Sequence, residues 1–164
     1  MKSLKLKIGI VGCGAIGTSL AKAIVTDFSD KAELTSLYDI DIEKAYRLSS
    51  ALKTKKIAAL TLDDLINNAQ LVIEAASAKS SYEIAKKSLS ASKDIMIMSV
   101  GGIAEYYKEL FALAKEKNTK LYIPTGAICG LDGLKAARES KINKITLTTK
   151  KPPSAFKGVA YVLK

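Results

Sequence analysis

The stretch Gly9-Ile10-Val11-Gly12-Cys13-Gly14-Ala15-Ile16-Gly17 separates an apolar, alternating segment at residues 4–10 from an amphipathic helical segment. Glycine at position 12 allows a tight strand-to-helix turn, Gly14 lets a pyrophosphate approach the backbone, and Gly17 lets the helix pack closely on the strand. Unpaired N–H groups at the start of the helix would then face the phosphates. In this context the motif predicts a dinucleotide-binding turn, and a glycine turn without a ligand is the alternative. The expected cofactor contacts in the turn are Gly12, Gly14, Ala15, Ile16 and Gly17.

The rest of the chain alternates short apolar segments with amphipathic helical ones. This order predicts an α/β fold, a Rossmann-type doubly wound parallel sheet. Thr61 and Asp64 resemble a capping box that opens a short helix. The expected strands cover residues 4–11, 34–38, 57–60, 71–73, 95–98 and 121–123. We expect the first helix to face the core with Ile16, Leu20 and Ile24. The helix after residue 102 is expected to bury Ile103, Tyr107, Leu110, Phe111 and Ala114.

Residues 1–140 are expected to complete one dinucleotide-binding domain. Residues 144–149 alternate again, with Ile145 and Leu147 on one face. This pattern predicts the first strand of an incomplete second domain. We therefore expect residues 141–164 to begin that second domain.

Asp39 follows the second expected strand, about 20 residues after the glycine motif. A carboxylate there accepts hydrogen bonds from the adenosine ribose hydroxyls and repels a 2′-phosphate, which favours NAD over NADP. A lysine near this turn, Lys44, leaves NADP as the alternative cofactor. A solvated turn residue is the alternative role for Asp39. Ile40 is expected to contact the cofactor beside it, and Asp41 to cap the following helix.

Small residues follow the later strands at the edge where a ligand would bind. Ala75, Ala76 and Ser77 come after the strand at residues 71–73 and are expected to leave room for the dinucleotide. The alternative is that these residues only connect the strand to the next helix, with Ser77 near the start of that helix. Residues 99–102 and 125–127 end later strands on the same edge, where they would face the nicotinamide or serve only as turns.

The chain has 164 residues, two cysteines and no histidine. The lack of histidine excludes a Ser-His-Asp triad, a histidine base and any His-containing metal site within the chain. Two distant cysteines are too few for a disulfide framework or a metal cluster, so no metal site is expected. Cys13 is interpreted as a small packing residue inside the glycine motif.

The formal net charge is +10, but only Arg47 and Arg138 among the 26 basic residues are arginines. Base readout and bidentate phosphate recognition favour clusters of arginine, so no nucleic-acid partner is expected. No apolar run reaches the roughly 18–20 residues that would span a bilayer. We expect a cytoplasmic protein without a membrane contact.

The whole chain resembles the L-aspartate dehydrogenase family of archaea and bacteria. The matching segments are residues 9–17, Tyr38-Asp39, Glu74-Ala75-Ala76-Ser77, residues 126–132 and residues 147–153. The resemblance implies oxidation of L-aspartate by NAD or NADP, through iminoaspartate, to oxaloacetate and ammonia. It also implies a supply of the imine to NAD biosynthesis and a homodimer formed through a second α/β domain. It places Ala127 at a cofactor contact, and Cys129 departs from the glycine that is usual in the family.

Members of this family are longer, and their catalytic histidine lies in the part that this chain lacks. The catalytic residues are therefore unknown, and the chain alone is expected to bind the dinucleotide without turning over aspartate. Two alternatives stay open. One is another two-domain amino-acid or imine oxidoreductase, similar to homoserine dehydrogenase. The other is a non-catalytic NAD-binding module.

Overall fold

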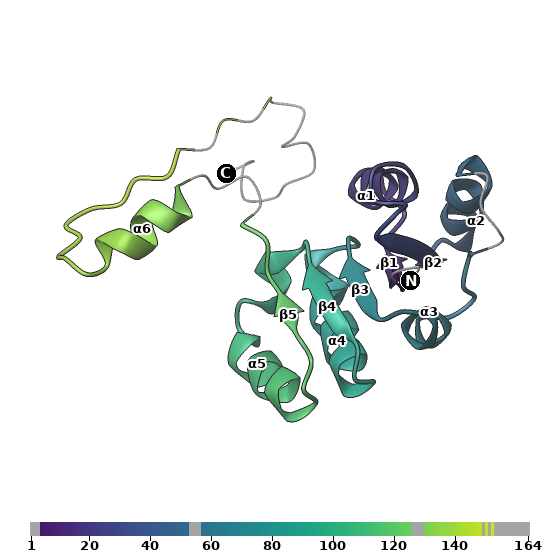
Figure 1. The fold of residues 1–164 in the computed structure, drawn as a ribbon. Helices are drawn as coiled ribbons and strands as arrows, with labels where there is room; N and C mark the ends of the chain where they lie inside the picture. Colours follow the sequence, from purple (N-terminus) through teal and green to yellow (C-terminus); the bar gives the residue numbers. More distant parts are fainter. Residues whose placement is uncertain (1–3, 53–56, 126–129, 149, 151, 153–164) are drawn as a thin grey trace. The chain divides into compact units, whose positions relative to one another are not determined.

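The computed structural model describes residues 4–52, 57–125, 130–148, 150 and 152, and the chain divides into two units, Met1–Gly126 and Ala127–Lys164. The first unit contains a five-stranded sheet in the order β2-β1-β3-β4-β5 (Figure 1). All neighbouring strands are parallel. The strands are β1 (Leu6–Val11), β2 (Ala32–Tyr38), β3 (Leu71–Glu74), β4 (Asp94–Ile97) and β5 (Leu121–Tyr122). Because the order reverses at β1, the predicted doubly wound α/β fold is confirmed.

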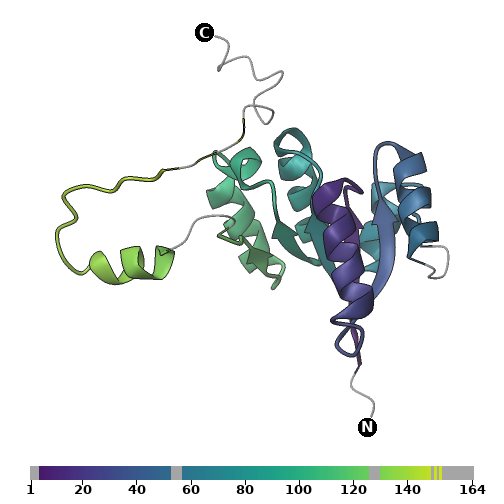
Figure 2. The ribbon, with the colours of Figure 1, turned by 90° about the horizontal axis from the view of Figure 1, so that it is seen from above.

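Helices cover both faces of this sheet (Figure 2). Buried residues of α1 and α2 pack with β1 and β2 on one face. On the other face, α3 lies against β1 and β2, and α4 lies against β3 and β4. The helical elements are α1 (Ala15–Thr26), α2 (Ile42–Ala51), α3 (Leu62–Asn68), α4 (Ala78–Ser90), the 3-10 turn η1 (Val100–Ile103), α5 (Tyr107–Glu116) and, in the second unit, α6 (Leu131–Ala137). The central strands are therefore buried on both sides, as is usual for parallel sheets.

The helix α3 begins as the sequence predicts. The backbone N–H of Asp64 donates to the Thr61 side-chain oxygen over 3.0 Å, which is the expected N-cap bond. The strand predicted over residues 57–60 is reduced to a single bridge between Leu37 and Ala58. It stops there because the chain turns outward at Leu60, which is 71% exposed, and enters the capped helix.

Three residues that helical periodicity assigned to the core are exposed. The buried line of α1 runs through Gly17, Ala21 and Ile24, which leaves Ile16 on the outside. Helix α5 buries Leu110 and Ala114 but exposes its two larger aromatic residues, Tyr107 and Phe111. The reason lies in the sheet edge: β5 has only two residues, so little sheet surface is available beneath a wide apolar stripe.

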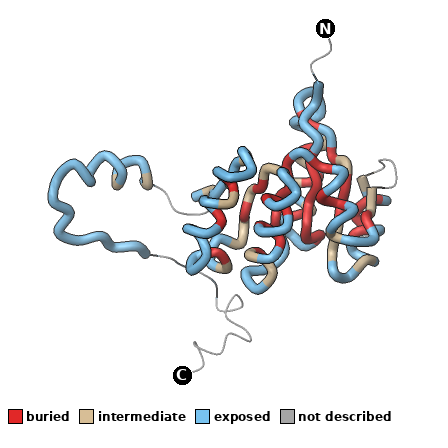
Figure 3. Tube along the Cα trace, turned by 90° about the horizontal axis from the view of Figure 1, so that it is seen from below, coloured by how far each residue is buried: buried red, intermediate tan, exposed pale blue. Residues whose placement is uncertain are grey.

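The prediction of a strand over residues 144–149, in the second unit, is wrong for the residues of that range that the structure describes. Residues 144–148 form no strand, and Ile145 and Leu147 are exposed. A strand needs a neighbour for its backbone N–H and C=O groups, and residues 130–148 offer none. All residues of this range are exposed or half-buried (Figure 3). The predicted domain boundary between residues 140 and 141 stays a prediction.

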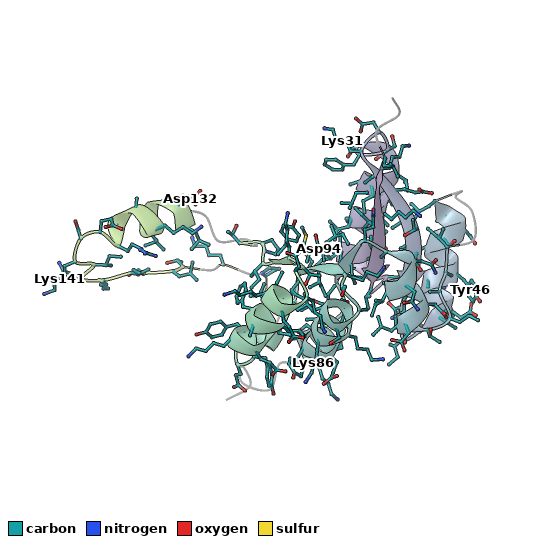
Figure 4. All side chains as sticks on the ribbon, turned by 60° about the horizontal axis from the view of Figure 1, so that its bottom comes forward. Lys31, Tyr46, Lys86, Asp94, Asp132 and Lys141 are labelled. Atoms are coloured by element: carbon teal, nitrogen blue, oxygen red, sulfur yellow. The ribbon has the colours of Figure 1, made fainter. Side chains whose placement is uncertain are left out.

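Basic side chains of the first unit are dispersed. Figure 4 shows Lys31, after α1, and Lys86, on α4, at opposite ends of this unit. None of the helices that the structure describes is long and apolar enough to cross a membrane. The expectation that the chain has no nucleic-acid partner stays a prediction.

Core packing gives a direct test of this fold. Leu89 of α4 is completely buried, so Leu89→Ala removes packed methyl groups and is expected to lower the free energy of unfolding by about 2–5 kcal/mol. Leu60→Ala is the matched control, because Leu60 is 71% exposed. Its expected effect lies within about 0.5 kcal/mol. Urea titration followed by circular dichroism measures both, and equal losses would contradict the packing of α4.

Candidate functional site

Gly12 directly follows β1 and has a conformation that favours glycine, with φ at +98°. Its N–H donates to the Tyr38 carbonyl oxygen of β2 over 2.7 Å. A Cβ atom at this position would lie 2.5 Å from the Ala75 carbonyl oxygen, just beyond β3. A side chain is therefore excluded at Gly12 by both the backbone angle and the neighbouring strand.

The helix α1 presses directly against this turn. A Cβ atom on Gly17 would collide with the Gly12 carbonyl oxygen, and Gly17 itself is buried. The first helical hydrogen bond runs from the Thr18 N–H to the Gly14 carbonyl oxygen over 2.9 Å. This close packing brings the start of α1 to the carboxyl end of β1.

Gly14, the N-cap of α1, lies open. A Cβ atom there would meet nothing within 4 Å, so the protein's own packing does not require glycine at this position. No side chain among the described residues caps the helix, and its first turn holds no acidic residue. The N-terminus of a helix carries partial positive charge and unpaired N–H groups, which suit a phosphate. The space at Gly14 and the uncapped helix together fit a pyrophosphate.

The carboxylate of Asp39 connects the end of β2 to this turn. Its Oδ2 accepts a hydrogen bond from the Cys13 N–H over 2.8 Å, and its Oδ1 accepts one from the Asp41 N–H over 3.0 Å. Asp39 is half-buried. A carboxylate has about four lone-pair positions, so these two bonds leave capacity for ribose hydroxyls. The structure thus brings together the turn and the acid that the sequence singled out.

Cys13 is buried within the glycine turn. Burial, followed by the nearby negative charge of Asp39, raises the pKa of its thiol to about 12, although Lys44 partly offsets the increase. The thiol therefore stays protonated at neutral pH and is a poor nucleophile. This agrees with a packing role for Cys13. Within the described residues, no cluster of His, Cys, Asp and Glu side chains could hold a metal ion.

The small residues after β3 lie where the sequence placed them. The Ala75 N–H donates to the Val11 carbonyl oxygen over 2.8 Å, whereas Ala76 and Ser77 are exposed. Ser77 is the N-cap of α4, and its hydroxyl lies 3.0 Å from that of Ser80. The alternative role of Ser77, at a helix start, is therefore confirmed, and its contact with a cofactor stays a prediction.

Glu74 ends β3 and is completely buried. Its Oε1 accepts hydrogen bonds from the Ala76 N–H over 2.8 Å and from the Ser99 hydroxyl over 2.9 Å. Its Oε2 accepts a third from the Ser99 N–H over 3.0 Å. In the sequence, Glu74 is distinguished only as part of a motif that matches the family. The missed signal is a single acid at the end of an otherwise apolar buried strand.

The remaining predicted contacts divide into three groups. Ala15, Ile16 and Ile40 are exposed beside the turn, and Ile40 is 95% exposed. Ala127 lies outside the described residues. Residues 100–103 form η1 rather than a plain turn after β4. Contact of these residues with a cofactor stays a prediction.

Residues 12–124 match the protein family described as "Homoserine dehydrogenase, NAD binding domain". The chain belongs to this family. This NAD-binding domain is 42% identical to the L-aspartate dehydrogenase of Methanosarcina barkeri, over 96% of the chain and 58% of that relative. It is 45% identical to the L-aspartate dehydrogenase of Methanosarcina acetivorans, over 96% of the chain and 59% of that relative. The predicted resemblance is confirmed, and the chain spans about three-fifths of the length of these relatives.

Solved structures support the fold of the NAD-binding domain. The apo scyllo-inositol dehydrogenase from Lactobacillus casei superposes with a TM-score of 0.66 and 20% identity. The match covers 75% of this chain and 37% of that enzyme. At this identity the likeness concerns the fold alone.

Two glycine substitutions separate packing from ligand binding. Gly14→Ala adds a methyl group in open space and is expected to change the free energy of unfolding by less than about 1 kcal/mol. If the pyrophosphate binds here as predicted, the methyl group would occupy its space and should weaken NAD binding about tenfold or more. Gly17→Ala forces a clash with the turn and is expected to cost about 3 kcal/mol or more of stability.

Thermal unfolding and calorimetric titration with NAD measure the two effects. Unchanged NAD affinity in a well-folded Gly14→Ala variant would show that the pyrophosphate lies elsewhere.

Proposed function

We propose that the chain is the cofactor-binding part of an NAD-dependent L-aspartate dehydrogenase. The observation that carries the proposal is 42–45% identity to two L-aspartate dehydrogenases over 96% of the chain. The open space at Gly14 and the half-buried carboxylate of Asp39 support it, because they suit a pyrophosphate and a ribose.

The strand order suggests how the dinucleotide lies. Ligands of doubly wound sheets bind outside the carboxyl ends of the strands, where the strand order reverses. Here the reversal occurs at β1, between β2 and β3. We infer that the pyrophosphate lies at the start of α1 and the adenosine ribose at Asp39. The nicotinamide then lies toward the ends of β3 and β4.

In the proposed reaction, the Cα–H bond of L-aspartate breaks and hydride passes to the nicotinamide ring, while the amine loses a proton. The products are iminoaspartate and the reduced dinucleotide. Water then adds to the imine, and ammonia leaves to give oxaloacetate. The acid or base that moves these protons is not a histidine of this chain, which contains none. A homodimer, a cytoplasmic location and a supply of imine to NAD biosynthesis stay predictions.

The choice between NAD and NADP depends on the charge of Asp39. We expect the chain to bind NAD at least about tenfold more tightly than NADP, because Asp39 repels a 2′-phosphate. Asp39→Asn keeps an oxygen for the Cys13 N–H but removes the charge. It should weaken NAD binding by about 1.5–3 kcal/mol and abolish the preference. Calorimetric titration with both dinucleotides measures this.

Asp41→Asn is the matched control, because Asp41 is exposed and pairs with Lys44 at 3.8 Å. It should leave the preference for NAD intact. Tighter binding of NADP by the unsubstituted chain would contradict the role of Asp39 and would point to Lys44 as a phosphate ligand.

The substrate is tested by a screen of the protein from its natural source, with its mass measured. We expect L-aspartate to support reduction of NAD, and L-lactate to support none. The 164-residue chain by itself should bind NAD without measurable oxidation of aspartate, because the loss of acid–base help from a histidine alone costs about 10²–10⁴ in rate. L-homoserine as the best substrate would favour the activity named in the family's description. Binding without any turnover by the natural protein would favour a non-catalytic module.

A further inference from the structure

Glu74 is the one completely buried carboxylate in the described part of the chain. A buried charge is costly unless hydrogen bonds compensate for the lost water. Three donors surround this carboxylate: two backbone N–H groups and one hydroxyl. No buried side-chain oxygen or nitrogen among the described residues lacks a partner. Both oxygens of the carboxylate therefore have hydrogen-bond partners within the protein itself.

The three donors come from two different loops. Ala76 belongs to the loop after β3, whereas the Ser99 N–H and hydroxyl belong to the loop after β4. The backbone adds one more tie, since the Met98 N–H donates to the Glu74 carbonyl oxygen over 2.9 Å. The Glu74 side chain thus fixes the spacing between the loop after β3 and the loop after β4.

The loop after β3 also adjoins the glycine turn. A Cβ atom on Gly12 would lie 2.5 Å from the Ala75 carbonyl oxygen, and the Ala75 N–H binds the carbonyl oxygen of Val11. A shift of this loop would therefore change the surface that continues from the glycine turn toward the ends of β3 and β4, where the nicotinamide half is proposed to lie. Asp39 holds the opposite side, at the end of β2, through the Cys13 N–H.

We infer that Glu74 is a positioning residue: it holds the loops after β3 and β4 in the arrangement that binds the nicotinamide half of the dinucleotide. The inference rests on the proposed orientation of NAD. Glu74 itself touches no cofactor, because it is completely buried and acts through Ala76 and Ser99. Asp39 serves the adenosine half, so the two carboxylates have separable effects.

The test compares NAD with ADP, which carries the adenosine and pyrophosphate but no nicotinamide. Glu74→Gln has nearly the same shape but replaces one acceptor oxygen with an amide donor, which then faces an N–H donor. We expect the dissociation constant of NAD to rise about tenfold and that of ADP to change less than about twofold. Calorimetric titration measures both constants in the 164-residue chain.

Two further variants serve as control and reserve. Val72→Ala lies two residues earlier in β3 and is also completely buried, so it weakens the core without touching the loops. In Val72→Ala, the dissociation constants of NAD and ADP should change by the same factor, if they change. Ser99→Ala removes only the hydroxyl bond to Glu74. If Glu74→Gln does not fold, Ser99→Ala provides a milder change, which should also weaken the binding of NAD more than that of ADP.

Amide hydrogen exchange gives a readout that needs no ligand. In Glu74→Gln, exchange should become faster in residues 75–79 and 98–104, whereas α1 and β1 should keep the rates of the unsubstituted chain. Equal weakening of NAD and ADP, or unchanged exchange in both loops, would overturn the inference. If the unsubstituted chain binds neither NAD nor ADP, the proposed function fails, and hydrogen exchange still decides whether Glu74 holds the loops.

Discussion

The turn after β1 is held so closely that neither Gly12 nor Gly17 has space for a side chain: Ala75 lies against Gly12, and the Gly12 carbonyl oxygen lies against Gly17 of α1. At this point the Gly12 N–H binds the end of β2, and the end of β1 accepts a hydrogen bond from the Ala75 N–H after β3. The meeting point coincides with the reversal of strand order. As a result, the uncapped end of α1 opens at the edge of the sheet where a dinucleotide binds.

Two carboxylates at this edge differ because they differ in burial. Both accept backbone N–H groups and so hold loops in place. Asp39 is half-buried and uses one bond for each oxygen, which leaves lone pairs for a ligand. Glu74 is completely buried, and all its partners belong to the protein. Because of this difference in burial, Asp39 is suited to binding a ligand and Glu74 is suited to holding the neighbouring loops.

Two of the predictions that the structure overturns have one physical origin. Periodicity predicts that a segment is helical or extended, but the neighbouring surface decides which side is covered. Helix α5 exposes Tyr107 and Phe111 because β5 is short. Residues 144–148 alternate like a strand, yet they have no neighbour among the described residues and form none. Both cases depend on a partner surface that the local sequence does not contain.

The sequence by itself determined the order of strands and helices, the glycine turn and the Thr61 cap, because each depends on residues a few positions apart. It also placed Asp39 at the end of its strand. Only the tertiary structure decided what the carboxylates hold. The partners Asp39 and Cys13 are 26 residues apart, and Glu74 and Ser99 are 25 apart. Parallel strands bring such distant residues together only after the sheet has formed, because their carboxyl ends then lie at one edge.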